Sequence, residues 1–257
     1  MPTSKQKKQL RKVSVVIILS VLLTVIFIMF YQWVTFKKIE FVRYPEFGID
    51  IPEHFAIHGI DVSKYQEKIA WDEVKAMQVK NIRMGFAFIK ATEGIKNEDP
   101  QYKRNWKQAK NAGMHRGAYH FFIASKDGAL QAQNFINSVN LETGDLPPVL
   151  DVEQLFGTSP EQLKREMKKW ILAIENHYHV KPIIYTNVDF YQRFLGNEFD
   201  GFPLWIAHYY QQQKPRINRA WTFWQHSDIG RVNGISSKVD FNVFNGDSAA
   251  FKNLLLP

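Results

Sequence analysis

The 257-residue sequence contains no cysteine. This absence excludes disulfide bonds, cysteine-based zinc sites, a catalytic thiol and the lipidated cysteine of a bacterial lipoprotein. The histidines and acidic residues also lack the spacing typical of a metal site, so we expect no metal and no cofactor. No internal repeat with a period of roughly 20 to 50 residues is visible, so we do not expect a repeat architecture.

Most of the chain carries nearly equal numbers of basic and acidic residues. The formal net charge is +8, but residues 1–12 carry five lysines and arginines and no acid. The remaining residues hold 28 basic and 25 acidic side chains, which gives no reason to expect nucleic-acid binding. A hydrophobic content of 45% is ample for a folded core.

The N-terminal region has the pattern of a membrane anchor. Residues 13–31 contain no charge and are mostly Val, Ile, Leu and Phe, which is long enough for a helix to cross a bilayer. A cleaved signal peptide is the alternative, but Phe30, Tyr31 and Trp33 stand where a small-residue cleavage site is expected. We therefore predict a basic cytoplasmic tail over residues 1–12, a transmembrane signal anchor over residues 13–33, and the rest of the chain outside the cytoplasm.

Residues 34–57 have no clean periodicity. They mix charges of both signs with aromatic residues and are broken by Pro45 and Pro52. We predict a stalk or connector here, followed by a catalytic domain over residues 58–257.

From residue 58 onward, apolar strand patterns alternate with amphipathic helix patterns. Expected helices cover residues 71–79, 101–112, 127–139, 160–178 and 189–195. Expected strands cover residues 58–62, 82–90, 116–122, 146–151, 182–186, 204–208, 221–226 and 239–243. Regular alternation through the first five units indicates parallel βα repeats, and eight strands in about 200 residues indicate a closed barrel. The last gaps are too short or too rich in Pro, Gly and Asn for good helices, so we predict an irregular TIM-like barrel.

The centre of the domain is the stretch Leu-Pro-Pro-Val-Leu-Asp-Val-Glu from Leu146. Side chains on a strand alternate between its two faces, so Asp151 and Glu153 are expected to point the same way. Two neighbouring carboxyl groups raise the pKa of at least one of them, which makes a plausible acid near neutral pH. The alternative is a solvated pair that caps the next helix.

Chemistry in such a barrel lies at the carboxyl ends of the strands. The candidate residues there are Asp61, Lys90, Glu93, Tyr119, His120, Asp151, Glu153, Tyr185, Trp205, His208, Trp224, Gln225 and Asp240. Aromatic faces and carboxylates together suit a carbohydrate. Alternatives remain for several: Lys90 and Glu93 also fit a plain salt bridge, Tyr119 a core position, and the two histidines simple packing. Trp221 and Trp224 fall on opposite faces, so at most one of them serves the mouth.

Eight segments resemble family 25 glycoside hydrolases, the lysozyme family also known from phage endolysins and fungal muramidases. They are Gly-Ile-Asp-Val-Ser from Gly59, Phe-Ile-Lys-Ala-Thr-Glu-Gly from Phe88, Gly-Ala-Tyr-His-Phe from Gly117, Leu-Asp-Val-Glu from Leu150, Pro-Ile-Ile-Tyr-Thr from Pro182, Leu-Trp-Ile-Ala from Leu204, Phe-Trp-Gln-His from Phe223 and Val-Asp-Phe-Asn from Val239. The resemblance spans residues 58–246. It implies an irregular β/α barrel that cleaves the β-1,4 bond between N-acetylmuramic acid and N-acetylglucosamine.

The resemblance also implies roles for particular residues. Glu153 falls on the proposed acid, and Asp151, Asp61 and Asp240 fall on the other acids of the mouth. Tyr119, Tyr185, Trp205, Trp224, Gln225, Lys90 and Glu93 are then candidates for substrate binding. The expected partners are peptidoglycan strands and a membrane, and we expect a monomer. Two alternatives are a silent glycan-binding protein and a chitinase-like hydrolase.

Overall fold

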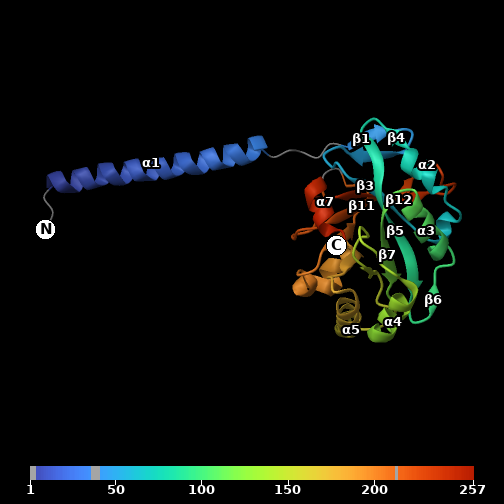
Figure 1. Cartoon of the computed structure of the whole chain (residues 1–257). Coiled ribbons are helices and arrows are strands. Elements are labelled where there is room, and N and C mark those ends of the chain that lie inside the picture. The colour runs from blue at the N-terminus through green and yellow to red at the C-terminus, as the bar shows by residue number, and fades with distance from the viewer. Residues whose placement is uncertain (1–3, 36–40, 212–213) are drawn as a thin grey trace. The chain divides into compact units, whose positions relative to one another are not determined.

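The computed structural model describes residues 4–35, 41–211 and 214–257. Helix α1 covers Ser4–Thr35, and its stretch Arg11–Tyr31 is long and apolar enough to cross a membrane, with none of it buried (Figure 1). The described residues from Phe41 onward form a second compact unit. The predicted apolar helix is therefore present, while its insertion into a membrane stays a prediction.

The second unit is a closed barrel of eight strands. They are β3 (His58–Val62), β5 (Ile82–Glu93), β7 (His115–Phe121), β8 (Val149–Asp151), β9 (Ile183–Asn187), β10 (Leu204–Ala207), β11 (Phe223–Gly230) and β12 (Val239–Phe244). Neighbouring strands pair around the ring, and pairing of β3 with both β5 and β12 closes it. This confirms the predicted irregular barrel. Two short strands, β4 (Gln78–Val79) and β6 (Asn97–Glu98), add antiparallel edges to β5.

Helices connect the strands in the first half of the ring. They are α2 (Trp71–Ala76), α3 (Tyr102–Asn111), α4 (Gly128–Ser138), α5 (Pro160–Tyr178) and the short α6 (Val188–Phe190), with turns of other helix types at Lys64–Gln66, Tyr191–Leu195 and Gly196–Phe199. Within the described residues between β10 and β12 no helix forms, as the composition of those gaps predicts. A further helix, α7 (Ser248–Leu254), was not predicted, and its Phe251 packs against Phe86 and Phe244 inside the barrel.

The last strand of the ring runs against its neighbours. Strand β12 pairs antiparallel with β11 and with β3, whereas the other pairs of the ring are parallel. Its amino end therefore lies beside the carboxyl end of β3. Asp240, the second residue of β12, thereby reaches the mouth, although in a parallel strand it would have started at the opposite end.

Residues 41–57 differ from the expected stalk or connector. Strands β1 (Phe41–Tyr44) and β2 (Ile49–Pro52) form an antiparallel hairpin whose Phe47 is completely buried. The Phe47 ring lies 5.4 Å from the Phe241 ring, and the Phe47 carbonyl accepts a hydrogen bond of 2.9 Å from the Arg231 amide. The hairpin therefore belongs to the barrel unit, because its aromatic side chains cover the outer face of β11 and β12. Residues 36–40 of the expected connector lie outside the described residues.

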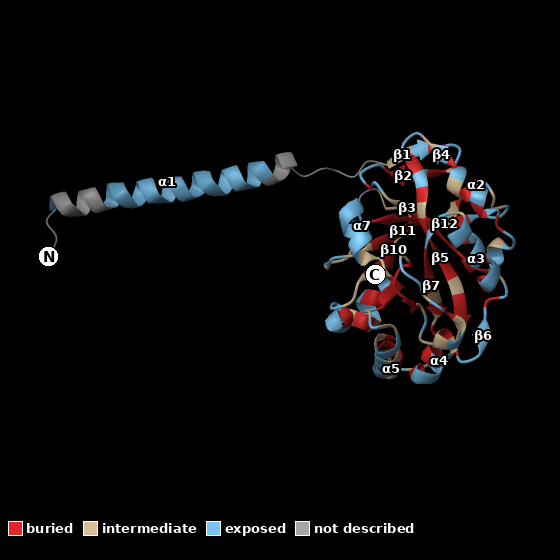
Figure 2. Cartoon of the chain, in the orientation of Figure 1, coloured by how far each residue is buried: buried red, intermediate tan, exposed pale blue. Residues whose placement is uncertain are grey.

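Alternation along the strands separates two packed layers. Phe86, Phe88, Val149, Trp205 and Phe223 fill the barrel interior. Residues of the opposite parity, such as Leu150, Val152 and Ile184, pack outward with the helices. Figure 2 shows the strands as largely buried and the exposed residues of the barrel unit mainly on the outer faces of the helices. The interior is filled by side chains, so polar groups collect only where the strands end.

Candidate active site

A cavity of about 260 Å³ opens at the carboxyl ends of the parallel strands. Its lining includes four acids from three segments: Asp61 of β3, Asp151 and Glu153 at the end of β8, and Asp240 of β12. Tyr119, Tyr185, Trp205, Gln225 and Lys90 line it as well. Nine of the 13 residues predicted for the mouth therefore meet in one place, and Glu93, His120, His208 and Trp224 are not part of this lining.

Asp61 and Asp240 face each other across the antiparallel pair of β3 and β12. They are direct partners in the strand register. The Asp61 Oδ2 atom accepts hydrogen bonds from Asn242 Nδ2 at 2.7 Å and from Gln225 Nε2 at 2.8 Å. Burial raises the pKa of Asp61 to about 6, while burial and the neighbouring Asp61 charge raise the pKa of Asp240 to about 9. The two amide donors make Asp61 the anion, so Asp240 retains its proton at neutral pH and donates it to Asp61 in a hydrogen bond.

Gln225 links the acids to two tyrosines. Its Oε1 atom accepts hydrogen bonds from the hydroxyl groups of Tyr185 at 2.7 Å and Tyr209 at 2.6 Å. Because these donors fix the amide oxygen, the amide nitrogen must point toward Asp61. The result is a connected polar floor in which the orientation of each group depends on the next.

Asp151 and Glu153 point into the cavity from the end of β8. Val152 between them is fully buried on the opposite side, in the layer against the helices, which agrees with the predicted alternation. Burial, followed by the charge of Glu153, raises the pKa of Asp151 well above its usual range. Burial also raises the pKa of Glu153, while the Tyr185 hydroxyl and Lys90 oppose that rise. The pair therefore retains a proton in a range where isolated carboxyl groups have lost theirs.

One oxygen of this pair has no partner. The Asp151 Oδ1 atom is buried and makes no hydrogen bond to any described residue. An unsatisfied buried acceptor costs free energy, on the order of 1 to 3 kcal/mol. Asp151 itself lines the cavity, so this oxygen is a candidate acceptor for a donor on a bound molecule.

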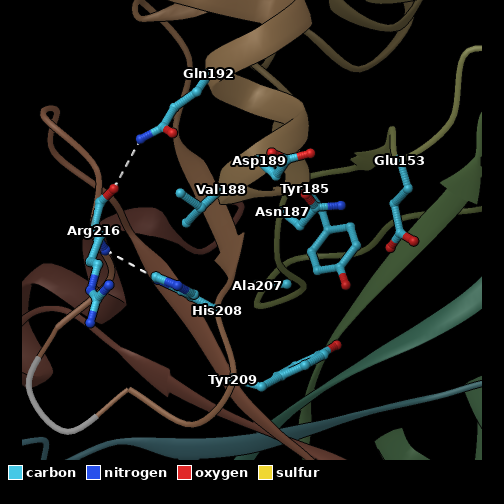
Figure 3. A pocket seen from close by; sticks show the side chains of 10 residues that line it. All are labelled: Glu153, Tyr185, Asn187, Val188, Asp189, Gln192, Ala207, His208, Tyr209 and Arg216. Carbon is cyan, nitrogen blue, oxygen red and sulfur yellow. Dashed lines mark hydrogen bonds between the residues drawn. The ribbon is translucent and has the colours of Figure 1, made fainter.

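A second recess of about 560 Å³ continues from the cavity and shares Glu153, Tyr185 and Tyr209 with it. Figure 3 shows the Glu153 carboxylate and the hydroxyl groups of both tyrosines directed into the same space. The two hollows meet at these shared residues and form one groove. Among the described residues, no group of three or more His, Cys, Asp or Glu is placed to hold a metal ion.

Residues 60–235 match the sequence profile of Glycosyl hydrolases family 25. The chain belongs to glycoside hydrolase family 25. It is 36% identical to Lysozyme M1 of Streptomyces globisporus, over 75% of this chain and 69% of that protein. It is 47% identical to the uncharacterized protein YegX of Escherichia coli K12, over 78% of this chain and 74% of that protein.

Solved structures agree with this assignment. A family 25 glycosyl hydrolase from Bacillus anthracis matches with a TM-score of 0.73 and 33% identity, over 80% of this chain and 96% of that one. A bacterial lysozyme from Streptomyces coelicolor matches with a TM-score of 0.71 and 34% identity, over 79% and 98% of the two chains. The protein is therefore a glycoside hydrolase.

Trp224 does not reach the groove of this family 25 hydrolase. It is completely buried, and its ring lies 5.8 Å from Phe41 of the hairpin and 6.2 Å from Phe55. Gln225 and Trp224 are neighbours on β11, and Gln225 takes the inward position. The predicted role of Trp224 in substrate binding is thus wrong, because alternation directs its indole to the outside of the barrel.

Trp205 forms the base of the groove rather than a free platform. Only 2% of it is exposed, its ring stacks on Phe88 at 4.3 Å, and its Nε1 atom donates to Asn242 Oδ1 at 2.7 Å. Through Asn242 it reaches Asp61. Trp205 therefore holds the polar floor in place and offers very little surface to a ligand.

The remaining predicted residues have structural partners. Lys90 Nζ lies 2.7 Å from Glu93 Oε2, which is the plain salt bridge that the sequence also allowed. His120 is buried against Trp170 and bonded to Thr92, and burial lowers its pKa to about 3. His208 lines the second recess. Of these, Lys90 and His208 face the groove of the family 25 enzyme, whereas His120 lies on the helix side of the barrel.

Several groove residues were not predicted. They are Ser63 and Tyr65 after β3, Phe121, Asn187, Asp189, Tyr209, Arg216 and, behind Asp61, Asn242. Asn242 had a sequence signal, because it stands two positions after Asp240 on the same strand and hence on the same face. Tyr209 and Arg216 lie in the irregular segment after β10, where no periodicity indicates which side chains point inward.

Proposed function

We propose that this family 25 hydrolase is a lysozyme that cleaves the β-1,4 bond between N-acetylmuramic acid and N-acetylglucosamine in peptidoglycan. The names of its relatives support this substrate, since they include Lysozyme M1 and an N,O-diacetylmuramidase from Chalaropsis that is 29% identical over 209 residues. The groove supports it through its combination of carboxyl groups, tyrosines and amides, which suits a polar sugar chain.

The observation that carries the mechanism is the buried, proton-sharing pair of Asp151 and Glu153 with its unpartnered oxygen. Glu153 serves as the general acid that protonates the leaving glycosidic oxygen. Asp151 accepts a hydrogen bond from the N–H of the substrate's 2-acetamido group through Oδ1. The acetamido carbonyl oxygen then attacks the anomeric carbon in place of a protein nucleophile, an exception to the two-carboxylate scheme.

Substrate binding prepares this pair for reaction. In the free protein burial raises the pKa of both carboxyl groups, so the pair holds a shared proton. A substrate N–H donated to Asp151 favours its ionised form. The shared proton then moves to Glu153. The general acid is therefore protonated only when a sugar with an acetamido group is bound.

The rest of the floor positions these two groups. Protonated Asp240 and ionised Asp61 keep one negative charge fixed beneath the reacting sugar, and Gln225 ties that charge to Tyr185 and Tyr209. Tyr119 and Tyr185 border the cavity from the side, and Lys90 offsets part of its negative charge. These residues, together with Trp205 and Glu93, bind or orient the glycan.

The N-terminal helix α1 holds the enzyme at a membrane. Residues 13–31 of this helix carry no charge, and the lysines and arginines of residues 1–12 place the N-terminus in the cytoplasm. The barrel then lies outside the cytoplasm, on the side where peptidoglycan is found.

The test is Glu153→Gln, which keeps the shape of the side chain and removes its proton. We expect loss of most of the activity on purified peptidoglycan with substrate binding retained, whereas the exposed Glu161→Gln control keeps wild-type activity. Mass analysis of wild-type products should show fragments with reducing-end N-acetylmuramic acid. Tight binding by the wild-type protein without new reducing ends would instead identify a glycan-binding protein, and faster digestion of chitin a chitinase-like enzyme.

Proton NMR of freshly released reducing ends tests the acetamido step. Attack by the substrate's own carbonyl, followed by water, retains configuration, so the β anomer should form first. Initial formation of the α anomer would show inversion and exclude the scheme.

A further inference from the structure

The second recess joins a negative end to a positive end. Glu153 lies at one side of it and Arg216 at the other, with His208, Asn187 and Val188 between them (Figure 3). The other three acids, Asp61, Asp151 and Asp240, line the neighbouring cavity and not the second recess. A ligand that fills both hollows therefore meets carboxylates with one part and a guanidinium group with another.

The guanidinium group of Arg216 makes no ion pair with the described residues. Arg216 is exposed, and no carboxylate among the described residues forms an ion pair with it. Asp189, another charged residue that lines the recess, is already paired with Arg193 Nε at 2.8 Å. Lys90 on the cavity side is paired with Glu93. Arg216 is thus the cation in the groove that remains available to a ligand.

The backbone of Arg216 is held in place from two sides. Its amide donates to His208 Nδ1 at 3.1 Å, and its carbonyl accepts from Gln192 Nε2 at 3.2 Å (Figure 3). Because Nδ1 of His208 is the acceptor, the neutral ring carries its proton on Nε2, where it is a second donor for a ligand. The backbone of Arg216 is thus fixed beside the groove, while no carboxylate among the described residues pairs with its guanidinium group, which suits a binding role.

We propose that Arg216, with His208 beside it, binds a carboxylate on the lactyl substituent of the muramyl residue. The inference rests on the proposed function and specifies its substrate. The sugar rings of peptidoglycan are uncharged, so a negative charge reaches the groove only as the free lactyl carboxylate of a stripped glycan or as a carboxylate of the stem peptide. The acids around Glu153 repel such a carboxylate. The guanidinium group of Arg216 attracts it and so favours binding with the carboxylate at that side of the recess.

The experiment compares three soluble, uncrosslinked substrates with the full-length protein in detergent. The first is glycan with intact stem peptides, the second is glycan freed of peptides by an amidase, and the third is peptide-bearing glycan whose carboxylates have been converted to methylamides. The variants are Arg216→Ala, Arg216→Lys and the control Arg43→Ala, another exposed arginine, which lies in the β1–β2 hairpin. Initial rates well below saturation give kcat/KM for each combination.

We expect Arg216→Ala to lower kcat/KM about three- to tenfold on a carboxylate-bearing substrate and to leave the methylamide substrate unaffected. Arg216→Lys should restore part of the loss, and the loss should shrink at high salt because exposed charges are screened. An effect on intact glycan alone assigns the stem peptide, and an effect on stripped glycan alone assigns the lactyl group.

Two results overturn the inference. One is an equal loss on all three substrates, which would make Arg216 a purely structural residue, and the other is no loss on any. The wild-type rates separate this failure from failure of the proposed function, since a protein that is not a lysozyme would cleave none of the substrates.

Discussion

Asp240→Asn should make the protein more stable near neutral pH while impairing its activity. The Asp240 carboxyl has a usual pKa of 3.8, and burial and Asp61 raise it to about 9 in the folded protein. The folded state therefore binds more protons than the unfolded state between about pH 4 and about pH 9, so stability falls as pH rises through this window. Asparagine has the same shape, still donates a hydrogen bond to Asp61, and never requires protonation.

The magnitude follows from the pKa difference. In the unfolded state the Asp240 carboxyl has its usual pKa, and pH 7 lies about three units above it. Keeping this carboxyl protonated in the folded protein at pH 7 therefore costs at most about 4 kcal/mol. Asp240 is partly accessible and shares its proton with Asp61, so we expect about half of that, or about 2 kcal/mol. For a barrel of this size the gain is about 4 to 8 °C in Tm.

Thermal unfolding followed by circular dichroism at pH 5 and pH 8 provides the assay. The increase in Tm of Asp240→Asn over the wild-type protein should be clearly larger at pH 8 than at pH 5. Asp228→Asn is the matched control, because Asp228 is exposed on the neighbouring strand β11 and adds only to the repulsion felt by Asp240. A gain that does not change with pH, or an Asp228→Asn gain of the same size, would refute the proton-sharing pair.

Three further predictions follow from the site and its surroundings. Asp151→Asn should reduce turnover roughly 100-fold in steady-state assays on peptidoglycan, the scale of one lost electrostatic stabiliser, and unchanged turnover would remove Asp151 from the mechanism. Trp224→Ala should lower the free energy of unfolding by about 3 to 5 kcal/mol in denaturant titrations, and a folded variant of full stability with a raised KM would contradict its packing role. A chain starting at Lys37 should be soluble and active, and its aggregation would argue against a separate anchor.

The barrel could be predicted because each strand carries its own signal. Apolar runs such as the one through Leu150 end in polar residues, and helix-sized gaps separate them. The direction of β12 could not be predicted, since it depends on which strands meet when the ring closes. The hairpin of residues 41–52 was missed for a similar reason: Phe47 finds its partner Phe241 almost 200 positions further along the chain.

The site was predictable where it lies on strands and unpredictable where it lies in loops. Alternation places Asp151 with Glu153, but it does not decide whether Trp224 or its neighbour Gln225 faces inward. Tyr209 follows the end of β10, where the backbone leaves the strand pattern and the side-chain direction is set by the hydrogen bond to Gln225. Arg216 lies in the same segment and carries no local signal at all.

The reversed strand β12 has a consequence for how the enzyme is made. Asp61 is synthesised 181 residues before its donor Asn242, which lies on the same strand as its partner Asp240. Until β12 has been added, the barrel lacks one wall and Asp61 lacks the hydrogen bonds from these two residues. A chain that stops before β12 therefore has no complete groove, and the enzyme cannot act before this strand is in place.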